Sequence, residues 1–178
     1  AYLLGASGQA SDVAILTRLA TAPPDARFTA ALDGILAGIV RQQPTEAWNL
    51  VQTIITDQKR SFTERHAILR FLRFQFEIDR ERNRTHMLSC MDKLIDQPDT
   101  MDLAIEQLRQ WKCWDHQSKI FKLYETSSGL APITVRAIVR YALSCPGDAS
   151  KLFIDTLRKK DPDLVHDVEE GLQLTEKP

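Results

Sequence analysis

The sequence predicts an all-α domain, and two patterns lead to this prediction. Apolar residues recur at spacings of three and four, which is the period of an amphipathic helix, and no convincing run alternates between apolar and polar residues as a half-buried strand does. Prolines stand mostly where a helix would begin, a position that suits the fixed φ and the missing N–H of proline. The ten expected helices are 11–21, 25–41, 45–57, 62–79, 85–96, 100–112, 116–127, 132–144, 148–159 and 162–172.

Capping residues mark the starts of three of these helices. Ser61 and Glu64 have the spacing of a capping box, in which each side chain accepts a hydrogen bond from the other residue's backbone amide. Asp99 precedes another expected helix, and Asp161 stands before Pro162 as an N-cap followed by a first-turn proline. The sequence therefore predicts where these helices begin.

Composition narrows the classes of function. The 178 residues are 43% apolar and 26% charged, with a mean hydropathy of -0.27, as in a folded globular chain. Lysine and arginine (23) nearly balance aspartate and glutamate (24), so the chain lacks the general basic field of a nucleic-acid-binding protein, and we expect no nucleic-acid partner. The apolar runs fall well below the roughly 18 residues that a membrane helix needs, and we expect no membrane span.

Two further features concern the cysteines and the start of the chain. Cys90, Cys113 and Cys145 are an odd number at wide spacings, which predicts buried free thiols rather than a disulfide framework. The chain begins at Ala1, and "YLLGASG" resembles a helix end closed by glycine. We therefore expect a fragment of a longer protein.

Four segments share one apolar pattern: "ERHAILRFL" (64–72), "MDLAIEQLR" (101–109), "VRAIVRYAL" (135–143) and "LVHDVEEGL" (164–172). Their matching positions 65, 102, 136 and 165 are 37, 34 and 29 residues apart, and a period near 35 indicates a repeat of helix pairs. Each pair leaves an apolar stripe that a stacked neighbour must cover. We therefore expect a right-handed alpha-alpha solenoid of about five helix pairs.

The V-R-x-x-V-x-x-A-L run at 135–143 resembles the second helix of a HEAT repeat, and the proline-marked helix starts are similar to that family and its armadillo relatives. One or two units match the pattern well, while the third has Asp102 where the family often has arginine. The resemblance implies a single HEAT-like repeat domain over 1–178. It also implies a noncatalytic protein-protein interaction scaffold that needs no cofactor.

Arginines are the expected contacts with a protein partner. Between positions 59 and 84, eight basic side chains stand against four acidic ones, and the expected link "DRERNR" (79–84) is long enough to contact an acidic partner. A stack of helix pairs also presents the polar side chains of its second helices on one surface. The candidate partner-binding residues are Arg65, Arg73, Arg80, Arg82, Arg136 and Arg140.

The stretch "QWKCWDHQSK" (110–119) admits three interpretations. Cys113 and His116 are a metal-ligand couple, but a structural zinc site needs four ligands and the only other close couple is His86 with Cys90, so we expect no metal.

Trp111 and Asp115 have a W-x-x-x-D spacing that resembles HEAT-like alkylpurine DNA glycosylases, in which these residues would contact the damaged nucleotide and stabilise positive charge on the sugar. The third interpretation is a corner between helices, sealed by two indoles, with Asp115 capping the next helix. We favour the corner and expect no catalytic residues; a glycosylase or an accessory repeat domain of a larger enzyme is the alternative.

Overall fold

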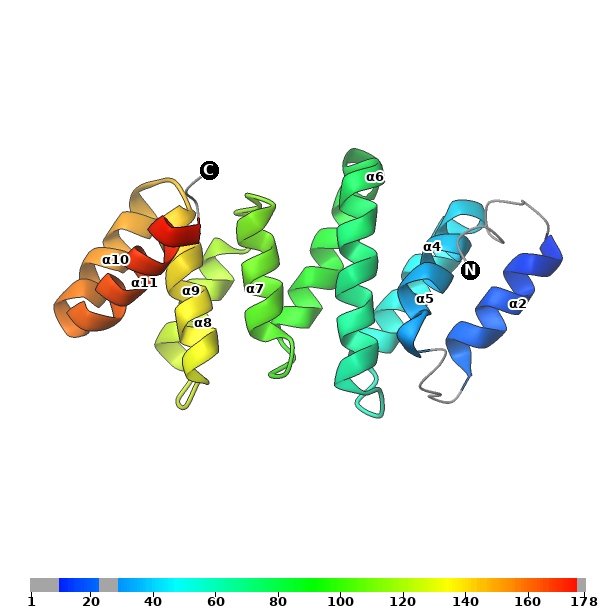
Figure 1. The fold of residues 1–178 in the computed structure, drawn as a ribbon, viewed down its shortest axis with the longest axis horizontal. Coiled ribbons are helices and arrows are strands. Elements are labelled where there is room, and N and C mark those ends of the chain that lie inside the picture. Colours follow the sequence, from blue (N-terminus) through cyan, green and yellow to red (C-terminus); the bar gives the residue numbers. More distant parts are fainter. Residues whose placement is uncertain (1–9, 23–28, 176–178) are drawn as a thin grey trace. The chain divides into compact units, whose positions relative to one another are not determined.

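The computed structural model describes residues 10–22 and 29–175, and the described part is all helical, with nine α-helices and no strand (Figure 1). This confirms the predicted all-α class. In chain order the helices are α2 (Ala10–Thr21), α4 (Leu32–Gln42), α5 (Pro44–Thr56), α6 (Phe62–Ile95), α7 (Met101–Gln110), α8 (Gln117–Thr126), α9 (Pro132–Ser144), α10 (Asp148–Lys160) and α11 (Pro162–Thr175).

Most expected helix bounds agree with these within a few residues, and α9 has the bounds that the sequence predicts. The helix expected at 25–41 begins on residues outside the described part, and its described portion is α4. The link expected at 79–84 is helical rather than extended, although Arg80, Glu81 and Arg82 are exposed as expected. Within α6 only Asp79 leaves the helical conformation, with φ -153° and ψ 64°, and the helix resumes directly after it. The reason is local: "RERN" contains no glycine or proline, and arginine and glutamate favour helix.

The chain divides into two compact units, Ala1–Asp96 and Gln97–Pro178. In the first unit α4 packs against α2, α5 and α6, and α5 packs against α6. The largest side chains in its core include Trp48, Leu36, Ile54 and Phe71, all of which are almost fully buried. The single repeat domain expected over 1–178 stays a prediction.

The second unit is organised around α9, which packs against α7, α8, α10 and α11. This central position explains the composition of α9, because helices on several sides leave little of it in water. Ala137, Ile138, Val139 and Tyr141 have no exposed surface. None of the helices described in either unit combines the length and apolarity that crossing a bilayer requires.

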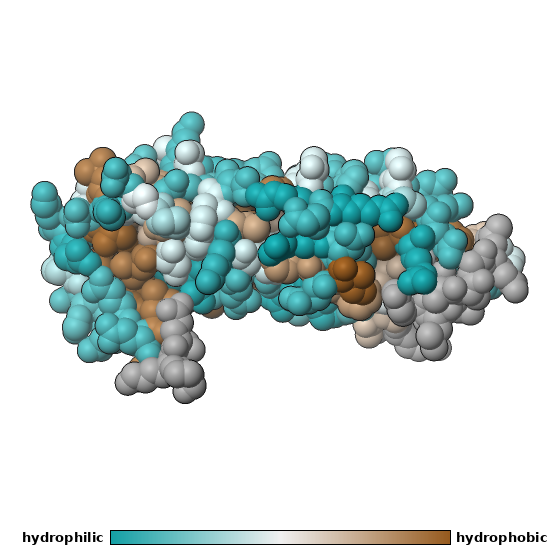
Figure 2. All heavy atoms as spheres, turned by 90° about the horizontal axis from the view of Figure 1, so that it is seen from above, coloured by the Kyte–Doolittle hydropathy of each residue, from teal (hydrophilic) through white to brown (hydrophobic). Residues whose placement is uncertain are grey.

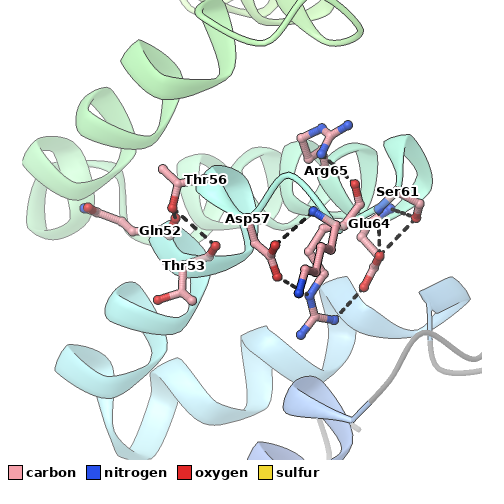
Figure 3. A network of polar contacts seen from close by, with 9 residues as sticks. Gln52, Thr53, Thr56, Asp57, Ser61, Glu64 and Arg65 are labelled. Atoms are coloured by element: carbon pink, nitrogen blue, oxygen red, sulfur yellow. Dashed lines mark hydrogen bonds and ion pairs between the residues drawn. The ribbon is translucent and has the colours of Figure 1, made fainter.

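The capping box before α6 is confirmed (Figure 3). The amide of Glu64 donates to Ser61 Oγ at 3.3 Å, and the amide of Ser61 donates to Glu64 Oε2 at 2.9 Å. Arg60 Nη1 also donates to Glu64 Oε1 at 2.7 Å, although Glu64 is only 2% exposed. Burial alone would raise the pKa of Glu64, but the bonds from Ser61 and Arg60 and the charge of Arg60 lower it below its ordinary value.

Of the other two predicted caps, Asp161 is confirmed, and the N-cap position expected at Asp99 lies one residue later. Asp161 Oδ1 accepts a hydrogen bond from the amide of Leu164 at 3.1 Å, as a cap before Pro162 should. The N-cap position of α7 is Thr100, one residue after the predicted Asp99, and it makes no side-chain cap bond.

Candidate functional site

A cavity of about 360 Å³ lies at the break in α6, between α6 and the end of α4. The break creates it, because the two halves of α6 are not collinear (Figure 1). We name this site the α6 cavity and define it by the residues that line it: Ala37, Val40, Arg41, Pro44, Phe74, Gln75, Ile78, Asp79, Arg82 and Asn83.

Two buried amide side chains line the α6 cavity. Asn83 Nδ2 donates to Gln75 Oε1 at 3.1 Å, and the residues are 8% and 4% exposed. Eight residues span about 12 Å along a straight helix, and the break at Asp79 brings the two amides together. Within the described part of the chain, Gln75 Nε2 and Asn83 Oδ1 make no other hydrogen bond. The pair that lines the cavity therefore keeps the Gln75 Nε2 donor and the Asn83 Oδ1 acceptor unused.

The rim of the α6 cavity is apolar on one side. Phe74 is 37% exposed and Ile78 is 55% exposed, and half-buried Val40 lines the same space. Large apolar side chains that share an edge with a cavity are typical of binding surfaces, whereas scattered ones are not.

Of the predicted partner-binding arginines in the first unit, Arg82 lines the α6 cavity and forms no ion pair with any described residue. Arg80 lies over the ring of Phe76, 5.3 Å from its centroid, and pairs with Glu81 at 3.2 Å. Arg73 is exposed on the first half of the same helix.

Arg65 has a structural contact, and so do the two arginines predicted in the second unit. Arg65 Nη1 donates to the carbonyl of Arg60 at 2.7 Å and so braces the turn before α6. Arg136 pairs with Asp167 at 3.4 Å, and Arg140 pairs with Glu106 at 3.2 Å. Of the six predicted partner-binding arginines, Arg82 is therefore the one that lines a described cavity, and Arg41 lines the same cavity.

The stretch 110–119 forms a turn between α7 and α8. Trp111 ends α7 and is 9% exposed, and Lys112 follows with a φ of +54°. The amide of Lys112 donates to the carbonyl of Arg109 at 3.0 Å, and that of Cys113 donates to the carbonyl of Leu108 at 2.9 Å. This pair of bonds is a Schellman motif, whose left-handed position usually holds glycine.

This turn corrects the expected cap and agrees with the expected corner between helices. The N-cap of α8 is His116 rather than Asp115, because the turn takes one more residue and the amide of Gln117 donates to the carbonyl of Trp114 at 3.1 Å. Trp111 and Asp115 do not share a helical face, since the chain leaves the helix between them.

The turn is anchored to the core of the second unit. The Tyr141 hydroxyl donates to the carbonyl of Cys113 at 3.1 Å. The ring of Trp114 packs edge-on against Tyr141, with 5.1 Å between the ring centroids. Packing against Tyr141 therefore accounts for the position of Trp114 in this turn.

A second cavity, of about 470 Å³, lies between α8 and α10, and the sequence analysis missed it. Phe121 and Phe153 stack in it with ring centroids 4.3 Å apart, and Leu152 at its edge is 69% exposed. Lys160 lies 5.7 Å above the ring of Tyr124. Figure 2 shows an apolar area at the left, over the α10 part of this unit. The available signal was the pair of aromatic residues three apart in α8.

The predicted free thiols are confirmed, because Cys90, Cys113 and Cys145 are unpaired and buried. Burial raises the pKa of the Cys90 thiol to about 12, against the opposing charge of Lys93. His86, the predicted couple of Cys90, stacks on Trp48 with ring centroids 5.1 Å apart. No group of three or more His, Cys, Asp or Glu side chains in residues 10–22 and 29–175 is placed to hold a metal ion.

The chain matches no protein-family model, no curated protein and no solved structure. The HEAT-like resemblance of 135–143 therefore remains an expectation from the sequence. The proposed function is therefore based on the residues that line the α6 cavity.

Proposed function

We propose that this chain is a noncatalytic protein-interaction domain, in which helix pairs stack as a HEAT-like right-handed solenoid of about five pairs. One observation carries the interaction function: the exposed apolar side chains of Phe74 and Ile78 border a cavity that also contains the unpaired cation of Arg82. Most of the binding free energy of a protein interface comes from a few residues, typically an anchor side chain that fills an apolar pocket and arginines close to it.

The packing within each unit supports the repeat architecture. In the second unit, successive helices pack on one another from α8 to α11, and α9 also packs against α7, which precedes it by two helices. Contacts to the next helix and to the helix beyond it are those that a stack of helix pairs makes.

The test is affinity capture from an extract of the source organism, with two matched variants. Ile78→Glu places a charge on the rim of the α6 cavity, where the wild-type side chain is 55% exposed. Ile133→Glu makes the same change at a side chain that is 59% exposed and does not line that cavity. Both variants should keep the wild-type thermal unfolding midpoint, because exposed substitutions shift stability by roughly 0.5 kcal/mol or less.

We expect the wild type and Ile133→Glu to retain the same protein in stoichiometric amount, and Ile78→Glu to lose it. Equal capture by all three chains would show that the α6 cavity is not the binding surface. No stoichiometric capture by the wild type would contradict the interaction function.

A further inference from the structure

We infer that the α6 cavity binds an acidic segment of a partner protein, which inserts one aliphatic side chain and pairs a carboxylate with Arg82. This inference rests on the protein-binding function proposed above and specifies the chemistry of the partner. Three properties of the cavity support it: its size and apolar wall, its charge, and its buried amide pair.

The size and wall of the cavity suit a single anchor side chain. A volume of about 360 Å³ is at the small end of ligand sites, enough for one leucine-sized side chain and the adjoining main chain. Val40, Phe74 and Ile78 would surround that side chain with apolar surface, and the exposed parts of Phe74 and Ile78 would become buried. Burial of an anchor in such a pocket is the usual source of interface energy.

The charge of the cavity favours an acidic segment. Its lining holds two cations, Arg41 and Arg82, against one carboxylate, Asp79. Arg82 has no ion-pair partner among the described residues, so its charge is available to a ligand. Beyond the cavity, exposed Arg73 and Arg80 on α6 are balanced by exposed Glu77 and Glu81, so the basic charge is centred on the cavity itself. Figure 2 looks down on the end of α6 that carries the break, and strongly hydrophilic atoms gather there.

The buried amide pair favours a polypeptide over a nucleic acid. Gln75 Nε2 and Asn83 Oδ1 belong to two amides that are bonded to each other, and this unused donor and acceptor would complement the C=O and N–H of a peptide group. A phosphate group accepts hydrogen bonds and donates none, so the Asn83 oxygen and the Asp79 carboxylate would face it unfavourably. The apolar wall likewise gives a phosphate nothing to bind.

Fluorescence anisotropy with the whole chain tests the inference directly. The probe is a short labelled peptide with one central leucine flanked by glutamate and aspartate. Two matched peptides replace the acidic residues by their amides or the leucine by glycine, and a labelled single-stranded oligonucleotide serves as a polyanion without an anchor. We expect the acidic leucine peptide to bind about tenfold more tightly than either matched peptide, with an affinity that falls as salt is raised. Equal binding of the neutral peptide, or tighter binding of the oligonucleotide, would overturn the inference.

A charge-reversal pair locates the binding. Arg82→Glu should lower the affinity for the acidic peptide by about tenfold, because the attraction between Arg82 and a peptide carboxylate becomes a repulsion. Arg18→Glu makes the same change in charge at an exposed arginine of α2 that does not line the cavity, and it should leave the affinity within about twofold of the wild type. Equal loss in both variants would mean that only the net charge of the chain matters.

A double substitution isolates the amide pair. Gln75→Leu with Asn83→Leu removes both hydrogen-bonding partners together, which leaves no buried group unpaired and should keep the thermal unfolding midpoint near that of the wild type. The peptide should bind about fivefold more weakly, since a donor and an acceptor for its main chain are lost. A stable double variant that binds like the wild type would show that the amides do not contact the peptide. Should this variant unfold, the Arg82→Glu comparison still decides the inference.

The two proposals fail in different ways. If no acidic peptide binds while capture of a protein still depends on Ile78, the partner chemistry is wrong and the protein-binding function stands. If neither occurs, both are wrong.

Discussion

Replacing Glu64 by glutamine should destabilise the first unit by about 2 kcal/mol at neutral pH, the cost of losing charge-assisted hydrogen bonds to a buried group. The carboxylate is 2% exposed and accepts from three donors: the Ser61 amide at 2.9 Å, the Ser61 hydroxyl at 3.0 Å and Arg60 Nη1 at 2.7 Å (Figure 3). Glutamine keeps the shape of the side chain but has one acceptor oxygen and no charge.

The difference between wild type and Glu64→Gln should depend on pH in a defined direction. Burial opposes ionisation of Glu64, but the bonds from Ser61 and Arg60 outweigh it, so the pKa in the folded chain lies below the ordinary value of 4.5. A carboxyl group with a lowered pKa stabilises the fold above its unfolded pKa, and this contribution is lost as pH falls through the folded pKa. The gap should therefore be full near pH 7 and should close below about pH 4.5.

Urea unfolding followed by far-UV circular dichroism at pH 7, 5 and 3 measures this gap. The control is Glu77→Gln, an exposed position on the same helix, which should change the free energy of unfolding by less than about 0.5 kcal/mol. A gap that stays unchanged at pH 3 would refute the electrostatic argument and point to packing. The absence of any gap at pH 7 would refute the stabilising role of the capping box carboxylate.

Two substitutions test the second unit, and a labelling experiment tests the Cys90 thiol. Tyr141→Phe removes the buried bond to the Cys113 carbonyl and should lower the free energy of unfolding by about 1–2 kcal/mol; no loss in urea titrations would exclude that bond. Lys112→Gly relieves the left-handed backbone and should raise stability by about 0.5–1 kcal/mol, whereas a lower melting temperature would mean the lysine side chain is needed. Because burial raises the pKa of Cys90 to about 12, its thiol should resist iodoacetamide at pH 8 until the chain unfolds, and peptide mapping of the labelled native protein checks this.

The helices and several of their starts were predictable from sequence because the interactions that specify them are local. The capping box joins residues three apart, and the Asp161 cap acts within one turn. The α7–α8 corner was harder, since its left-handed position holds Lys112 in place of the glycine that normally marks it. The sequence analysis placed the cap at Asp115 because it took the turn to be one residue shorter than it is.

For the α6 cavity too, the sequence predicted a local feature, the helix break, and not the contacts between residues that are distant in the sequence. The sequence predicted a helix break near Asp79 and singled out Arg82, but it placed an exposed link over 79–84. No pattern in "QFEIDRERN" indicates that Gln75 and Asn83 would bond across the break, or that α4 would close the cavity from the other side.

By itself, then, the sequence determined the all-α class, most of the helices, the capping box and the buried thiols, because hydrophobic periodicity and capping act over one or two turns. Only the tertiary structure decided which arginines are available to a partner. Arg65 is turned onto the Arg60 carbonyl and Arg140 onto Glu106, while Arg82 reaches a cavity without an ion-pair partner in the described chain. Whether an arginine forms an ion pair within the chain depends on residues that can be distant in sequence, and the packing of whole helices brings those residues together.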